Sequence, residues 1–230
     1  MQKDDQNKRG EHDLGGKTAE PTKSNAMRSP AMRIVMGIVG FVVMICGLLQ
    51  MYSGIKEMSS GGLPSVSDRQ AVVDKSLASM TEFQDAKSGF SMSYPSNWTR
   101  TEKVNEPMIL KVAVYEGTIN VSATAEDESK ELTSTQYAQL TDEMIGKSIG
   151  KMGLEKVSED DISLNGTPGR KRIHVLTTQS DGKDVRVKQV MILAAKNGKG
   201  YSMTASAIED WYPQFEPVIN KMIESIKIKD

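Results

Sequence analysis

Residues 165–207, NGTPGRKRIHVLTTQSDGKDVRVKQVMILAAKNGKGYSMTASA, decide the fold of this chain. The stretch contains three dipeptides of the Asn-Gly or Asp-Gly type, which readily adopt the positive φ angles of tight hairpin turns. These pairs are Asn165-Gly166, Asp181-Gly182 and Asn197-Gly198. The strand-like segments between and after them are 170–178, 185–195 and 201–207. The stretch therefore predicts a meander of long antiparallel strands.

A hairpin and a helix precede this meander. Residues 109–115 and 119–125 are strand-like runs joined by a short turn at Glu116-Gly117. Thr133 and Gln136 have the spacing of a capping box, which predicts a helix start. Apolar residues then follow at helical spacing: Tyr137, Leu140, Met144, Ile145, Ile149 and Met152. We expect this helix to end near Gly150 or Gly153.

Two more helices are predicted at the ends of the domain. Pro213 opens the last one, whose apolar face carries Phe215, Val218, Ile219, Met222, Ile223 and Ile226. The final residues, IKIKD, are expected to add an edge strand. Ahead of the domain, Val73, Leu77 and Met80 are spaced as in a short leading helix.

The run from Ile34 to Ile55, IVMGIVGFVVMICGLLQMYSGI, carries no charge and predicts a transmembrane helix. A buried helix of a soluble domain is the weaker alternative, because the run is apolar on every side. A cleaved signal peptide remains open, although the polar residues before the run argue against it. Lipid attachment at Cys46 also remains open, although Ile45 is larger than the residue expected there.

Composition shifts along the chain divide it into four parts. Residues 1–32 are polar and charged and form a disordered tail. Residues 33–55 form the transmembrane helix, 56–82 a linker with a short helix, and 83–230 the folded domain. Basic residues before the helix, such as Lys23, Arg28 and Arg33, favour a cytoplasmic N-terminus. The domain is therefore expected outside the cytoplasm, on a protein that crosses the cell membrane once.

Charge and cysteine content exclude several classes of function. The net charge is -1, so no overall attraction to nucleic acid exists. Cys46 is the only cysteine and His12 and His174 are the only histidines, which excludes internal disulfides and structural zinc centres. No phosphate-binding glycine loop or dinucleotide fingerprint is present. We therefore expect no cofactor.

The order of these features resembles the PsbP-like superfamily from about Phe83 to the C-terminus. The resemblance rests on GFSMSYPSNW at 89–98, the hairpin, the central helix, SLNGTPG at 163–169, the meander and the ending MIESIKI. That superfamily includes a photosystem extrinsic subunit, a Ran-binding transport factor and bacterial DcrB-like envelope proteins, whose layout the membrane anchor suits. The resemblance implies an α+β fold, an αβα sandwich with a central antiparallel sheet, and binding roles in place of shared catalysis.

Candidate site residues are few. Arg170, Arg172, Arg186 and Lys188 lie on neighbouring predicted strands and are expected to form a basic patch for an acidic partner, with a solvated face as the alternative. Strand alternation places His174 with Arg172 on an apparently polar face, and no nucleophile motif accompanies it. The acidic clusters 126–128 and 159–161 lack the spacing of a calcium loop and are expected to be solvated strand ends. Tyr94, Pro95 and Trp98 are expected to anchor a structural corner.

The sequence therefore predicts a non-enzymatic, membrane-anchored accessory or assembly factor of the cell envelope. Its expected partners are a protein in or near the membrane and the bilayer that holds the N-terminal helix, with no nucleic acid. The alternative is an envelope small-ligand carrier or a hydrolase with its site near His174.

Overall fold

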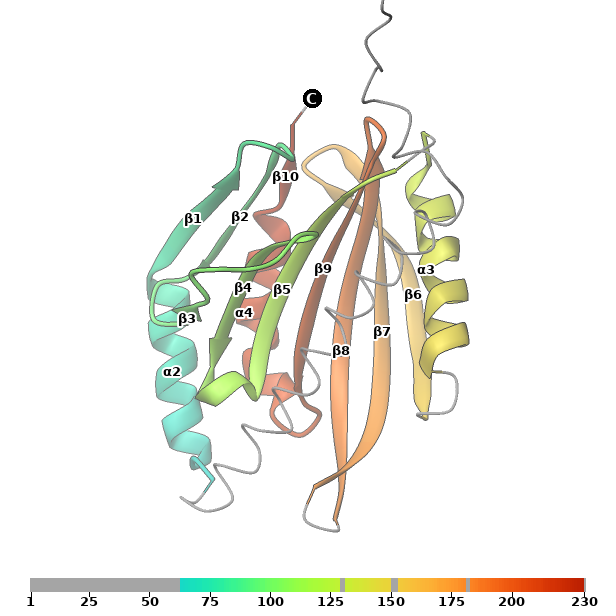
Figure 1. The fold of residues 1–230 in the computed structure, drawn as a ribbon. Helices are drawn as coiled ribbons and strands as arrows, with labels where there is room; N and C mark the ends of the chain where they lie inside the picture. Colours follow the sequence, from blue (N-terminus) through green and yellow to red (C-terminus); the bar gives the residue numbers. More distant parts are fainter. Residues whose placement is uncertain (1–62, 129–130, 150–152, 181–182, 230) are drawn as a thin grey trace, which may run out of the picture.

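The computed structural model describes residues 63–128, 131–149, 153–180 and 183–229 (Figure 1). Its helices are α2 (Val66–Ala78), α3 (Ser134–Ile149) and α4 (Tyr212–Glu224), with a short turn of 3-10 helix, η2 (Tyr115–Gly117). The first five strands are β1 (Met80–Asp85), β2 (Phe90–Pro95), β3 (Thr99–Arg100), β4 (Met108–Val114) and β5 (Ile119–Asp127). The others are β6 (Leu154–Leu164), β7 (Thr167–Ser180), β8 (Lys183–Lys196), β9 (Lys199–Ile208) and β10 (Lys227–Ile228).

The strands form two sheets, and every pairing is antiparallel. The large sheet has seven strands in the order β3-β4-β5-β9-β8-β7-β6, and the small one has three in the order β1-β2-β10. The predicted α+β architecture of antiparallel strands is confirmed, with two sheets instead of one central sheet. The last strand, expected from IKIKD, lies at an edge of the small sheet.

The predicted meander forms the larger part of the seven-stranded sheet. Asn165 and Asn197 have φ angles of 48° and 53°, and each is followed by a glycine with positive φ. These values are those that tight hairpin turns require. The Asp181-Gly182 pair lies outside the described residues. The sequence did not single out β6, the edge strand that precedes the first of these turns.

The helix boundaries agree with their sequence signals. The Gln136 amide N–H donates to Thr133 Oγ1 at 3.2 Å, and the Thr133 N–H donates to Gln136 Oε1 at 2.9 Å. This is the expected capping box of α3. Pro213 lies in the first turn of α4, as predicted. Leu140 is an exception to the predicted face of α3, because 41% of it is exposed.

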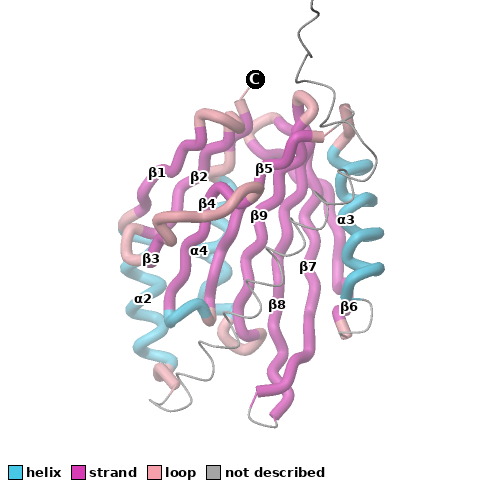
Figure 2. Tube along the Cα trace, viewed as in Figure 1, coloured by secondary structure: helices cyan, strands magenta, loops and turns pink. Residues whose placement is uncertain are grey.

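Helices cover the large sheet on both sides (Figures 1 and 2). On β8, alternate residues Val190 and Ile192 belong to the main core that includes α4. Met191 and Leu193 point the other way and pack with Tyr137 and Ala138 of α3. The core under α3 is therefore much smaller than the core under α4.

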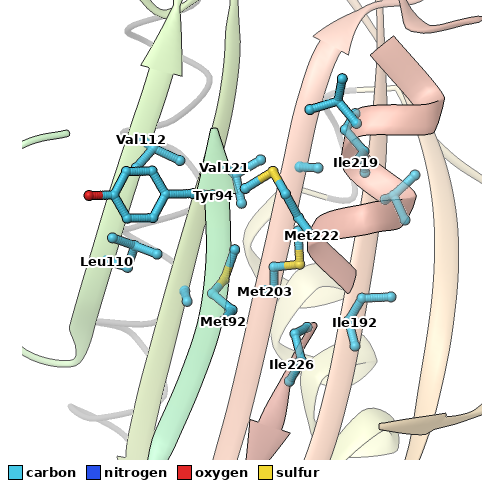
Figure 3. Packing of buried hydrophobic residues seen from close by; sticks show 14 of the residues in the cluster. Met92, Tyr94, Leu110, Val112, Val121, Ile192, Met203, Ile219, Met222 and Ile226 are labelled. Atoms are coloured by element: carbon cyan, nitrogen blue, oxygen red, sulfur yellow. The ribbon is translucent and has the colours of Figure 1, made fainter. Parts of the chain in front are cut away.

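The main core lies between the small sheet, the large sheet and α4 (Figure 3). Met92 of β2 meets Met203 of β9 and Met222 of α4 in this region. Tyr94 and Trp98 are buried, with 8% and 4% of their surfaces exposed, so the structural corner is confirmed.

Helix α2 belongs to the folded domain, which corrects the boundary expected at Phe83. Val73 of α2 is part of the main core. Trp98 Nε1 donates to Ser76 Oγ at 3.0 Å, and the Arg69 guanidinium stacks on the Trp211 ring at 4.8 Å. Phe83 itself lies inside β1. The sequence placed α2 in the linker because it has only one narrow apolar stripe, and Met80 belongs to β1 instead of the helix.

The predicted transmembrane run, Ile34 to Ile55, the polar tail and Cys46 all lie outside the described residues. Among the helices that the structure describes, none is long and apolar enough to cross a membrane.

Candidate functional site

The side of the large sheet that faces away from α4 is polar across β4, β5 and β9. Cross-strand pairing places these side chains on one surface, because directly opposed residues point to the same side. We call this surface the polar face; its residues are Lys111, Asn120, Ser122, Thr124, Gln189, Ser202, Thr204 and Ser206. Hydroxyl and amide groups dominate it, which suits hydrogen bonding more than hydrophobic packing. All of these residues except the half-buried Ser202 are buried.

Helix α3 crosses one side of this surface diagonally. At its start, Tyr137 lies against Gly200 of β9 so closely that a Cβ there would be 2.3 Å from Tyr137 Cε2. Further along, Asp142 pairs with Arg172 of β7 and, at 3.6 Å, with Lys156 of β6. The helix therefore moves from β9 toward β6 along its length.

Arg172 fastens α3 to the sheet. It is 1% exposed and donates from Nη1 to Asp142 Oδ1 at 2.8 Å and to the Ala138 carbonyl at 2.9 Å. Its Nη2 donates to Glu159 Oε1 of β6 at 3.2 Å. Burial acts to raise the pKa of Glu159, but hydrogen bonds from Lys156, Arg170 and Arg172 outweigh it and lower that pKa to about 2. Glu159 is therefore ionised at all ordinary pH values.

One line of cross-strand partners links the polar face to the ion pairs around Arg172. Direct cross-strand partners run from Lys156 to His174, Gln189, Ser206 and Asn120. Gln189 Nε2 donates to Ser206 Oγ at 3.0 Å. His174 and Gln189 are 3% and 1% exposed, and neither His174 Nδ1 nor Gln189 Oε1 has a hydrogen-bond partner. We call these five residues the central row.

The structure does not bring the four predicted partner-binding residues into one basic patch. Arg170 and Arg172 lie on the α3 side of the sheet, where Arg170 pairs with Glu159 at 2.8 Å and with Asp161. Arg186 and Lys188 lie elsewhere: Arg186 pairs with Glu209 at 2.5 Å, and Lys188 lies 4.1 Å from the centre of the Tyr212 ring.

The expected solvated face at Arg172 and His174 is also corrected, because both residues are buried. Alternation predicted their shared side of the strand correctly, but α3 covers that side.

The surroundings of His174 differ from those of a catalytic base. Burial lowers its pKa below the ordinary value, and the nearby charge of Arg172 adds to that effect. Its Nδ1 is hydrogen-bonded to no carboxylate, whereas the histidine of a Ser-His-Asp triad needs such a partner to orient it. The ring is therefore neutral at pH 7, and its chemistry is that of a hydrogen-bonding group.

A separate cleft of about 270 Å³ opens between the β1–β2 turn and the adjacent ends of β5 and β9. Pro107, Ile109 and Ala125 give it an apolar side, and Asp85 and Glu126 contribute carboxyl groups. Burial raises the pKa of Glu126 to about 7, and the neighbouring Glu128 adds to the rise. This cleft is the second candidate for a binding site.

The two acidic clusters have different surroundings. Glu159 and Asp161 form ion pairs with Arg170, and Asp127 forms one with Lys199. Within the described part of the chain, no group of three or more potential ligands could hold a metal ion.

Sequence reasoning missed Gln189, Ser206 and Asp142 as site residues. Gln189 and Ser206 are common polar residues with no motif around them, and only strand register brings them beside His174. Their alternation with the apolar Val190 and Ala205 was the one available signal, since it places them on the opposite side of the sheet from the main core.

Comparison with known families agrees with this layout. The family model described as PsbP matches residues 78–228, which span both sheets, α3 and α4. The chain belongs to the PsbP family. The resemblance to the PsbP-like superfamily is thereby confirmed. No curated protein matches the sequence.

Three solved structures are similar to parts of this chain to different degrees. Cyanobacterial PsbP (CyanoP) from Synechocystis sp. PCC 6803 superposes with a TM-score of 0.53 at 14% identity, covering 66% of this chain and 94% of that one. The Ran-binding protein Mog1p of Saccharomyces cerevisiae has a TM-score of 0.45 at 8% identity, with 66% and 96% covered. LpqN, involved in cell envelope biogenesis of Mycobacterium tuberculosis, has a TM-score of 0.40 at 12% identity, with 66% and 91% covered. At 14% identity, the likeness to CyanoP extends to the fold alone.

Proposed function

We propose that this protein is a non-enzymatic, membrane-anchored accessory or assembly factor of the cell envelope, and that its PsbP-like domain binds a protein partner through the polar face. The observation that carries the proposal is the central row. Two buried polar atoms at its centre, His174 Nδ1 and Gln189 Oε1, have no partner in the domain. Such atoms in a native protein call for an explanation, and the row to which they belong continues through Ser206 and Asn120 across the polar face.

The anchor part of the proposal rests on the uncharged run from Ile34 to Ile55. A run of this length is long enough to span the hydrocarbon core of a bilayer. Basic residues before it favour a cytoplasmic N-terminus and an outward-facing domain. On cells stripped of outer layers, added protease should therefore remove the domain. A domain that resists protease until the cells are lysed would contradict this orientation.

The partner part can be tested on the full chain, solubilised from membranes in mild detergent. A native gel should show the wild-type protein in a complex larger than its monomer. Thr204→Lys places a long charged side chain on the polar face and should shift the protein to the monomer position, because an unpaired charge at an interface is strongly unfavourable.

The matched control is Thr177→Lys, at an exposed position of β7 on the same side of the sheet as Ile173, which packs against the main core. That side is opposite the polar face. This variant should keep the larger complex, and circular dichroism should show both variants folded. Equal migration of the two folded variants would count against the polar face.

A small-ligand carrier remains the second candidate, and the cleft beside Glu126 is the observation that favours it. Thr204 is not among the residues that line the cleft, so a carrier with the Thr204→Lys substitution should keep its bound ligand. The ligand should then be released when the variant is denatured. Mass spectrometry of the denatured protein would detect that ligand.

A further inference from the structure

Two exposed apolar side chains mark the end of the domain where the chain enters α2. Leu63 and Val66 are 61% and 64% exposed, the two highest values among the exposed large hydrophobic residues that the structure describes. Val66 lies about two helical turns before Val73, so the two valines point to the same face of α2. Val73 belongs to the main core, but Val66 does not. The apolar face of α2 therefore continues past the end of the core and emerges at the surface.

Hydrogen bonds hold this end of α2 in place. Gln214 Nε2 of α4 donates to the Val66 carbonyl at 3.2 Å, and Arg69 Nη1 donates to the Pro64 carbonyl at 2.6 Å. A capping box at Ser65 satisfies amide groups of the first turn. The two exposed apolar side chains are thus presented on a fixed support whose polar backbone groups are paired within the domain.

This end is also where the chain comes from the predicted membrane anchor. Only residues 56–62 separate Leu63 from Ile55, the last residue of the uncharged run. A linker of this length spans about 25 Å when fully extended, and the headgroup layer outside the hydrocarbon core is about 5–8 Å thick. With the run in the bilayer, the start of α2 is therefore held within about 20 Å of the headgroups. A short tether gives an effective concentration in the millimolar range, so weak apolar contacts are enough for docking.

We infer that the α2 end of the domain docks on the bilayer surface, with Leu63 and Val66 inserted between the lipid headgroups. Removal of each apolar side chain from water favours this position. The Tyr115 hydroxyl donates to the Asp68 carbonyl at 3.4 Å, which brings Glu116 to the same end. The exposed charges of Asp68 and Glu116 are negative, so docking depends on apolar contact and not on attraction to anionic lipids.

The inference rests on the proposed membrane anchor and adds the orientation of the domain. The turn between β1 and β2 lies at the opposite end from the start of α2 (Figure 1). Docking at the α2 end therefore directs this turn away from the membrane.

The test uses the full chain reconstituted in phosphatidylcholine vesicles, with a polarity-sensitive fluorophore as the probe. Cys46→Ser removes the only cysteine, so that Ser67→Cys or Ala86→Cys can be labelled alone. Both positions are exposed, Ser67 in the first turn of α2 and Ala86 in the β1–β2 turn. A nitroxide on the lipid headgroups should quench the label at position 67, whereas the label at position 86 should be quenched only by iodide in the water.

Substitution of the two apolar side chains checks that they cause the docking. Leu63→Asp and Val66→Asp should each lower the ratio of docked to undocked domain by about 10-fold, because the favourable transfer of one side chain is lost. The label at position 67 should then become accessible to iodide. The matched control is Val157→Asp, at a valine of β6 that is 56% exposed, on the strand at the far edge of the large sheet. This control should keep the wild-type quenching, and circular dichroism should show all variants folded.

Equal quenching of the two labels by the lipid nitroxide would overturn the inference. A label at position 67 that neither quencher reaches would also overturn it and show that protein covers this end. If the chain floats with the vesicles while iodide reaches position 67, docking fails and the proposed anchor stands. If the chain does not float with them, the anchor and the docking fail together.

Discussion

Removing the buried guanidinium of Arg172 tests how α3 is held to the sheet. Arg172→Ala eliminates hydrogen bonds to Asp142, Glu159 and the Ala138 carbonyl. Breaking a buried ion pair costs about 3–5 kcal/mol, because the remaining charge is left unpaired. The side chains of Asp142 and Glu159 are 38% and 19% exposed, and Glu159 keeps Arg170 and Lys156, so both carboxylates retain some compensation. We therefore expect a loss near the lower limit, about 3 kcal/mol in the free energy of unfolding.

The assay is urea unfolding followed by circular dichroism, with Arg186→Ala as the control. Arg186 also occupies the meander and pairs with Glu209, but its side chain is 52% exposed. Exposed pairs contribute about 0–1 kcal/mol, so the control should unfold almost as the wild type does. If Arg172→Ala costs less than about 1 kcal/mol, the guanidinium is solvated and the network does not hold α3.

Three further perturbations probe the rest of the domain. Trp98→Ala should lower the free energy of unfolding by about 3–5 kcal/mol, because the buried indole also donates to Ser76; a loss under about 1 kcal/mol would place it at the surface. A fragment that begins at Leu63 should fold cooperatively, whereas one that begins at Ser79 lacks α2 and should melt at lower temperature; equal melting temperatures would contradict the role of α2. The raised pKa of Glu126, about 7, means that the folded state binds a proton more tightly than the unfolded state. The stabilisation that the bound proton gives the folded state is therefore lost as pH rises through 7. Glu126→Gln should stabilise the protein by about 1–2 kcal/mol at pH 8, where it removes a buried charge, but little at pH 5. An equal effect at both pH values would refute this reasoning.

Local signals in the sequence predicted most of the strands and the existence of α2, α3 and α4. The Asn-Gly turns, the capping box at Thr133 and the proline at the start of α4 each act within a few residues, so they can be recognised without knowing the fold. The place of α2 could not be recognised in this way. It depends on contacts with Trp98 and Trp211, which are distant in the sequence.

The candidate site was less predictable than the fold. Alternation placed Arg172 and His174 on one side of β7, but it could not show that α3 covers that side. An arginine in a strand is usually solvated, and only the register of β6 and the path of α3 supply the two carboxylates that allow Arg172 to be buried. Gln189 and Ser206 carried no signal beyond alternation, because their importance comes from neighbours on other strands.

The claim that the polar face binds the partner is tested most directly by photo-cross-linking in cells that express the full chain. A photoreactive amino acid is placed at Ser202, the polar-face residue that is not buried, or, as the control, at the exposed Thr177 on the opposite side of the sheet. The account predicts a discrete cross-linked product from Ser202, absent from Thr177 and lost when Thr204→Lys is added. A product from Thr177 but not from Ser202 would contradict the account.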